Sequence, residues 1–166
     1  KRCRLWASMP CVGGSSWNLK NYAYGTPATR AKIERHWKAF HSIWQAFVRV
    51  AETCLADDPT NVVSIEWPSR CAYWDLPDVR AFLEKHNFVK HDIHGCAYGL
   101  VGVNQHKGKP ILKPWTIATT SDNDVKYLNK RCPGEPSCVA WKDHATCEGD
   151  ETKLTEGYTW DLVASI

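Results

Sequence analysis

The feature that most constrains the fold is a long run with helical periodicity, flanked by two short apolar segments. Its apolar residues recur at steps of three and four, which places them on one face of a helix. These residues are Ile33, Trp37, Phe40, Trp44, Phe47, Ala51 and Leu55. Thr26 and Pro27 are typical of an N-cap and first helical position, and Asp57, Asp58 and Pro59 are expected to end the helix. This segment predicts one long amphipathic helix.

Short apolar runs before and after this helix predict strands. Leu5 to Met9 form a run that is too short for a helix and is bounded by Pro10, and residues 61–68 form a second run. A short helix is expected at 75–87 and another at 121–131. Strands at 88–103 and 111–120, joined by a glycine-containing turn, are typical of an antiparallel hairpin. Strands that alternate with helices predict an α/β fold with a parallel sheet closed by this hairpin.

Composition excludes some classes of protein. The 166 residues, 43% hydrophobic and 23% charged, suit one globular domain with a core, and a net charge of +3 does not by itself argue for nucleic acid. No apolar run approaches the roughly 20 residues that span a membrane. The eight cysteines and the absence of a secretory signal favour reduced thiols and an intracellular location. The chain begins at Lys1, directly before a strand, so we expect a piece of a longer protein.

Two reactive residue types lie at the ends of the first two predicted apolar runs. Cys11 lies beyond the first strand and is a candidate nucleophile, although a buried apolar role is the alternative. Glu66 ends the apolar run of the second strand, where a capping or ion-paired carboxylate is the alternative. Because adjacent parallel strands bring their carboxyl ends together, we expect Cys11 and Glu66 to share one cleft.

Three motifs and the element order resemble a known family. Pro10-Cys11 resembles the Pro-Cys motif of DNA cytosine-5 methyltransferases, and Ile65-Glu66-Trp67-Pro68 resembles their Glu-Asn-Val motif. Residues 94–99 and 113–120 resemble a hairpin of methyltransferase-like proteins of phages and mobile elements. The element order is similar to the second half of the class I S-adenosylmethionine-dependent methyltransferase fold. The resemblance thus implies a partial Rossmann-like methyltransferase sheet, ordered strand-helix-strand-helix-hairpin, with a Cys-rich C-terminal loop.

The resemblance also implies roles for individual residues. The Cys11 thiolate would add to carbon 6 of a flipped cytosine, so that carbon 5 can take a methyl group. Glu66 would hold the ring nitrogen and amino group of the base. A loop that closes on the substrate would contain Pro10, Ser15, Ser16 and Asn18.

The sequence departs from this family in ways that leave other functions open. It has no Gly-x-Gly cofactor turn and no Gln-x-Arg-x-Arg signature, so S-adenosylmethionine would bind only if an upstream domain or partner chain supplied the missing half. The chain can therefore be an active fragment or a pseudoenzyme. One alternative is a non-catalytic scaffold subunit of a larger assembly. Another is a DNA- or RNA-binding module that uses the basic face of the long helix together with Lys107, Lys109 and Lys113.

The C-terminal part predicts a metal site. Cys132, Cys138, His144 and Cys147 supply three thiolates and one imidazole, which suit a tetrahedral zinc ion. The alternatives are a surface loop with unpaired thiols, or a disulfide that joins Cys138 to Cys132 or to Cys147. We therefore expect a methyltransferase-like half-domain over residues 1–131 and a Cys/His-rich loop with a short helix over 132–166.

A second possible cluster lies in the third predicted strand. His94 and Cys96 would point to one face of that strand and His91 to the other. This pattern leaves open a core role or a contribution to the zinc shell, and we favour the core role.

Overall fold

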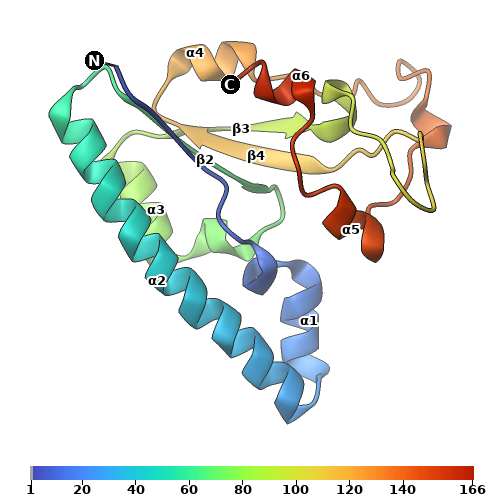
Figure 1. The fold of residues 1–166 in the computed structure, drawn as a ribbon, viewed down its shortest axis with the longest axis horizontal. Helices are drawn as coiled ribbons and strands as arrows, with labels where there is room; N and C mark the ends of the chain where they lie inside the picture. Colours follow the sequence, from blue (N-terminus) through green and yellow to red (C-terminus); the bar gives the residue numbers. More distant parts are fainter. Residues whose placement is uncertain (1) are drawn as a thin grey trace. The chain divides into compact units, whose positions relative to one another are not determined.

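The computed structural model describes residues 2–166. Lys1, the first residue of the half-domain predicted over 1–131, lies outside the described residues. Strands and helices alternate along most of the chain (Figure 1). The elements are β1 (Arg4–Ala7), α1 (Ser16–Tyr24), α2 (Pro27–Asp57), β2 (Val62–Pro68), α3 (Pro77–Lys85), β3 (Val89–His94), β4 (Pro114–Thr119), α4 (Asp122–Tyr127), α5 (Asp150–Leu154) and α6 (Trp160–Val163).

The four strands form one mixed sheet in the order β1-β2-β4-β3. β1 and β2 are parallel, with Arg4 opposite Val62 and Ala7 opposite Ile65. The far end of β4 runs against β2 in the opposite sense: the Thr120 N–H donates to the Val63 carbonyl, and the hydroxyl of Thr119 lies 2.9 Å from that of Ser64. The predicted α/β class with a parallel pair and an antiparallel closing strand is therefore confirmed.

The chain forms two compact units. Among the described residues, the first contains 2–90 and 117–121, and the second contains 91–116 and 122–166. Each of the strands β3 and β4 has residues in both units. In the described part of the chain, none of the helices combines the length and apolar character that crossing a bilayer requires.

In the first unit, α2 is the long amphipathic helix that the sequence predicts. The Thr26 hydroxyl accepts a hydrogen bond from the Thr29 N–H, and Pro27 is the first helical residue. Its buried residues form an aromatic core with side chains of β2 and α3. The Trp44 ring lies 6.1 Å from Trp67 and 5.5 Å from Phe82, centroid to centroid. Burial of such rings is the main source of stability for this unit.

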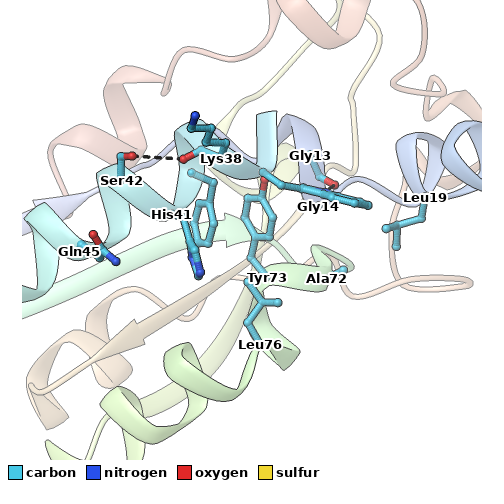
Figure 2. A pocket seen from close by; sticks show the side chains of 12 residues that line it. Gly13, Gly14, Leu19, Lys38, His41, Ser42, Gln45, Ala72, Tyr73 and Leu76 are labelled. Atoms are coloured by element: carbon cyan, nitrogen blue, oxygen red, sulfur yellow. Dashed lines mark hydrogen bonds between the residues drawn. The ribbon is translucent and has the colours of Figure 1, made fainter. Parts of the chain in front are cut away.

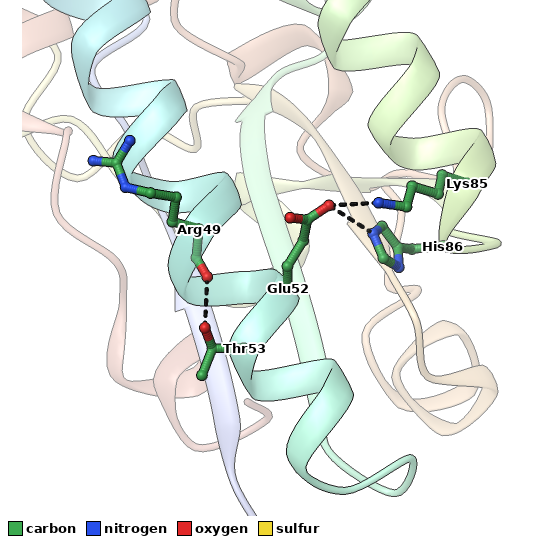
Figure 3. A network of polar contacts seen from close by, with 5 residues as sticks. All are labelled: Arg49, Glu52, Thr53, Lys85 and His86. Carbon is green, nitrogen blue, oxygen red and sulfur yellow. Dashed lines mark hydrogen bonds and ion pairs between the residues drawn. The ribbon is translucent and has the colours of Figure 1, made fainter.

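Helix α3 packs beside α2 through the residues that the sequence assigns to its inner face. Val79, Phe82 and Leu83 are buried. On the outside, the Glu52 carboxylate lies 2.6 Å from the Lys85 ammonium and 3.8 Å from His86 Nε2 (Figure 3). The hydrogen bond and charge of Lys85 lower the pKa of Glu52.

One helix of the first unit was not predicted. Residues 16–24 form α1, in a stretch whose polar and aromatic residues lack an apolar stripe. The helix has no buried residue, so amphipathic periodicity could not identify it. The Ser15 hydroxyl caps its start by accepting a hydrogen bond from the Asn18 N–H.

In the second unit, the prediction of a strand over 88–103 is wrong beyond His94. The chain turns into a short 3₁₀ helix over Gly95–Tyr98, and Gly99 follows with φ of 77°. A Cβ on Gly95 would lie 2.6 Å from Leu100 and 3.2 Å from the Trp115 ring. The close approach of these side chains, which only glycine permits, turns the chain away from the strand direction.

The expected turn at 107–110 exists, but it belongs to a small loop and not to a strand-to-strand hairpin. Val101 and Pro110 form an isolated antiparallel bridge, and Gly108 has φ of 79°. The Glu151 carboxylate of α5 holds this loop by accepting hydrogen bonds from the N–H groups of Val103 and Asn104. Helix α4 also ends earlier than predicted, at Tyr127.

Candidate functional site

The parallel pairing of β1 and β2 places the ends of the two strands side by side. Directly beyond β1, the Ser8 hydroxyl donates a hydrogen bond of 2.9 Å to Glu66 Oε2. The indole N–H of Trp67 donates to the Met9 carbonyl at 3.0 Å. These two bonds fix the chain that leads from β1 to Cys11, and Glu66 is only 4% exposed.

A second thiol lies near both predicted site residues. The charges of Cys11 and of Glu66 each act on the buried thiol of Cys71. Cys11 itself is half-buried. Burial is the main cause that raises the pKa of Cys71 to about 12, so Cys71 stays protonated and unreactive at neutral pH. The structure thus brings Cys11 and Glu66 into one neighbourhood, together with a thiol that the sequence analysis did not single out.

The segment expected to be a substrate loop is a helical turn followed by a helix start. Residues 12–14 form a 3₁₀ turn. Ser15 is the N-cap of α1, Ser16 is its first residue, and the Asn18 side-chain amide donates to the Val12 carbonyl at 2.6 Å. Pro10 is exposed. Ser15 and Asn18 therefore hold the backbone that follows Cys11, which gives them a positioning role.

A pocket of about 710 Å³ adjoins this segment in the first unit (Figure 2). Gly13 and Gly14 form part of its lining, and three aromatic side chains, Trp37, Phe40 and Tyr73, form further walls. Polar and basic side chains of α2 also line it, namely Lys38, His41, Ser42 and Gln45. A pocket with aromatic walls and basic groups suits a planar ligand that carries negative charge.

Close packing around Gly13 makes this pocket wall rigid. The indole N–H of Trp37 donates to the Gly13 carbonyl at 2.8 Å. A Cβ on Gly13 would lie 2.3 Å from the Tyr73 hydroxyl and 2.7 Å from the Trp37 ring. Burial raises the pKa of Tyr73 to about 12, so its hydroxyl is protonated at neutral pH. Gly13 does not have a positive φ. The position therefore requires glycine for space and not for its backbone conformation.

The second unit contains a group of side chains that can hold a metal ion. Cys96, Cys132 and His144 place their ligand atoms within 4.8 Å of one another, and all three residues are half-buried. Two of them belong to the predicted set of four, and Cys96 comes from the 3₁₀ helix after β3. The sulfur of Cys147, another of the predicted four, instead lies 3.5 Å from the Thr155 hydroxyl. No disulfide joins any of the eight cysteines, all of which lie within residues 2–166.

Two histidines have distinct places around this group. His144 Nδ1 lies 2.9 Å from the Ala140 carbonyl, and its Nε2 lies 3.8 Å from the Cys132 sulfur. His94 contacts the backbone of the group, because its Nδ1 accepts a hydrogen bond from the Cys132 N–H at 3.0 Å. The sequence pattern of His94 and Cys96 favoured a core role for both, but the structure draws Cys96 into the metal-binding group. The early end of β3 breaks the strand alternation on which that expectation depended.

The thiols of this group differ in their pKa values. Burial, with a further effect of Cys132, raises the pKa of Cys96 to about 12. Burial also opposes ionisation of Cys132, but hydrogen bonds from the Gly134 N–H and with the Cys138 and Cys96 side chains outweigh it and lower its pKa. Cys132 is therefore the member of the group that ionises first in the absence of metal.

The three lysines proposed to bind nucleic acid are not equivalent. Lys107 and Lys109 are exposed on the loop. Lys113 is half-buried, and its ammonium donates to the carbonyl and hydroxyl of Thr155 and lies 5.6 Å from the centre of the Trp115 ring. Lys113 thus has a packing role within the second unit, and only the other two present their charges to solvent.

Comparisons of this chain with protein-family models, with curated proteins and with solved structures found no match. The geometry of the described residues offers two centres. One is the Cys11 thiol beyond β1 with the Glu66 carboxyl group near the end of the parallel strand β2, and the other is a Cys/His group that can hold a metal.

Proposed function

We propose that this chain is a cytosine-5-methyltransferase-like domain that acts on a base of nucleic acid, with Cys11 as nucleophile and Glu66 as the acid that holds the base. The observation that carries the proposal is the hydrogen bond between Ser8 and Glu66, which links the chain beyond β1 to the end of β2. Cys11 follows Ser8 by three positions and is half-buried, as a nucleophile that must meet a substrate requires. A purely structural cysteine is more often fully buried.

The two groups have complementary chemistry toward a pyrimidine. A thiolate is a soft, strong nucleophile that can add to carbon 6 of cytosine. A carboxyl group that donates a proton to the ring nitrogen withdraws electron density and favours that addition. The adduct has a nucleophilic carbon 5, which can take up a proton from water. Loss of the original carbon-5 proton and departure of the thiolate then restore the ring.

The neighbouring pocket supports a nucleic-acid substrate. Bases stack on aromatic side chains, and phosphates bind to basic groups, so the half-buried Trp37 and the exposed Lys38 suit a nucleotide. Phe40 and Tyr73 are buried and stack on each other, and they support this wall from behind. A base that leaves its stack to reach Cys11 needs such surfaces around it. The pocket contains two residues of the turn that directly follows Cys11.

The sheet order supports the finer assignment to a partial Rossmann-like methyltransferase fold. Two strand-helix units precede a closing antiparallel strand, as in the second half of that fold. No two glycines of this chain are spaced as Gly-x-Gly, so the residues do not fit S-adenosylmethionine, and we assign no step to this cofactor here. Methyl transfer would require an upstream domain or a partner chain that supplies the cofactor site.

We also propose that the ion held by the Cys96–Cys132–His144 group is zinc. Thiolate and imidazole ligands together favour zinc over magnesium or calcium, which prefer oxygen. Metal analysis of the protein purified without chelator tests this assignment. About one zinc per chain is expected, and iron or no metal contradicts it.

The catalytic proposal can be tested without the cofactor half. Addition of a thiolate to carbon 6 labilises the hydrogen at carbon 5, so the chain should exchange it with solvent. The protein is incubated in D₂O with a single-stranded cytosine oligonucleotide, and deuterium at carbon 5 is measured by mass spectrometry. We expect exchange by the wild-type protein, none by Cys11→Ser, and a loss of about 100-fold in Glu66→Gln.

Cys71→Ser is the matched control, because it removes a neighbouring thiol that stays protonated. It should retain exchange, and circular dichroism should show that each variant is folded. Absence of exchange with both single-stranded and mismatched duplex substrates would overturn the catalytic proposal. If the same oligonucleotides bind in a salt-dependent way that survives Cys11→Ser, the chain is a binding module instead.

A further inference from the structure

We propose that Cys138 is the fourth ligand of the metal site, so that Cys96, Cys132, Cys138 and His144 form a closed Cys₃His centre that holds the second unit together. This inference rests on the proposed zinc binding and goes beyond it, because it defines the complete ligand set and its role.

The known distances suit a tetrahedral zinc ion. Zn–S bonds of about 2.3 Å and Zn–N bonds of about 2.0–2.1 Å put a sulfur and a nitrogen ligand about 3.6 Å apart in a tetrahedron. The Cys132 sulfur and His144 Nε2 are 3.8 Å apart, and the Cys96 sulfur lies within 4.8 Å of both. Three corners of the tetrahedron are therefore formed to within small side-chain movements.

Cys138 lies beside this group but outside it, because among the described residues only Cys96, Cys132 and His144 place their ligand atoms within 4.8 Å of one another. Its side chain interacts with that of Cys132 and its charge acts on Cys96, so its sulfur reaches the fourth corner by a movement of the side chain toward the ion. It is thus adjacent to two of the three ligands. Cys147 has no such contact in the described residues and lies instead beside Thr155. Of the two remaining cysteines predicted as ligands, Cys138 is the one that the fold brings to the group.

The chain between the ligands is wound to make these contacts. Gly134 has φ of 73°, and its carbonyl accepts the Cys138 N–H at 2.7 Å. The Trp141 N–H donates to the Cys138 carbonyl at 3.0 Å. These turns keep the segment between Cys132 and His144 compact.

The imidazole is oriented as a zinc ligand requires. With its proton on Nδ1, His144 donates to the Ala140 carbonyl and turns the lone pair of Nε2 toward Cys132. Four protein ligands leave no open coordination position, which is typical of structural and not catalytic zinc. The centre therefore joins the segment after β3 to the segment 132–144.

Cobalt substitution tests the ligand set directly. Co²⁺ replaces Zn²⁺ in tetrahedral sites, and the intensity of the thiolate-to-cobalt absorption follows the number of sulfur ligands. We expect a tetrahedral spectrum in the wild-type chain and a decrease of about a third in this absorption in Cys138→Ser, from three sulfurs to two. Zinc affinity, measured by competition with a chelator, should fall at least about 100-fold.

Cys147→Ser is the matched control and should leave the spectrum and the affinity unchanged. X-ray absorption on the wild-type zinc protein gives the ligand set without any variant, and three sulfurs with one nitrogen are expected. If the wild type binds no metal, the zinc proposal itself fails. If it binds zinc but Cys147→Ser is the variant that loses a sulfur, or if two sulfurs are found, the role of Cys138 is refuted.

Discussion

The Nε2 atom of His144 lies 3.8 Å from the sulfur of Cys132, while the Nδ1 atom of the same ring lies 2.9 Å from the Ala140 carbonyl. One ring thus contacts a thiol through one nitrogen and the backbone through the other. This relationship fixes which nitrogen can bind a metal and links the backbone of the Cys-rich segment to the group that can hold one.

Removal of the metal should unfold the second unit. Structural zinc contributes about 10–16 kcal/mol of apparent binding free energy in small zinc-binding peptides, which is comparable to the whole stability of a domain. Hydrogen exchange followed by mass spectrometry should show at least tenfold faster exchange over 91–116 and 122–166 after chelation. Helix α2 should keep its protection, because its aromatic core contains no metal ligand. Equal loss of protection in α2 would contradict this expectation.

The cysteines should differ strongly in reactivity once the metal is removed. At pH 8, a thiol with a pKa of about 12, as in Cys71, is ionised roughly a thousandfold less than an ordinary cysteine. Cys132 belongs to the second unit, which we expect to unfold on metal removal, so its thiol should react with iodoacetamide far faster than that of Cys71. Peptide mass spectrometry gives the individual rates. In denaturant the thiols of Cys71 and Cys132 should react at equal rates. Equal rates without denaturant would show that burial of Cys71 does not control its reactivity.

Gly13→Ala should destabilise the first unit by about 1–3 kcal/mol, because the added methyl group overlaps the Tyr73 hydroxyl and the Trp37 ring. Urea unfolding followed by tryptophan fluorescence measures this change. Combining the substitution with Tyr73→Phe removes the closest atom and should recover part of the loss. Gly157→Ala, which meets no atom within 4 Å, is the control and should be neutral. An equally stable Gly13→Ala protein would mean that the wall beside Cys11 is not rigid.

Acid should loosen the loop over 100–111 before it affects α2. The hydrogen bond from the Val103 N–H, with further bonds from Asn104 and His106, lowers the pKa of Glu151 below its usual value. A group with a lowered folded pKa stabilises the fold above its unfolded pKa, near 4.3, and loses that contribution as pH falls through the folded value. The protection factors of the three N–H groups, which correct for the intrinsic pH dependence of amide exchange, should therefore fall on acidification below about pH 4.

Glu151→Gln should remove most of this pH dependence and raise exchange of the same amides at neutral pH. Glu148→Gln changes an exposed neighbour and should have neither effect. If the wild-type loop shows no acid-induced loss of protection beyond that of Glu151→Gln, the role of this carboxylate is refuted.

Periodicity was sufficient for the elements with strong local signals. The extent of α2, its Thr26 cap and the buried face of α3 follow from the spacing of apolar residues and from capping chemistry, both of which act over a few residues. The same reasoning failed at α1 and beyond His94. Helix α1 buries no side chain, and the end of β3 depends on the approach of Leu100 and Trp115 to Gly95.

The sequence by itself determined the α/β alternation, the long amphipathic helix and the presence of thiols and imidazoles able to bind a metal. Only the tertiary structure decided which of them meet. Cys96 is separated from Cys132 by a long stretch of chain, and no local spacing rule relates the two. Nor does local spacing distinguish Cys138 from Cys147. Periodicity and capping reflect contacts within a few residues, whereas the metal-binding group depends on where β3 ends and how the chain returns to it.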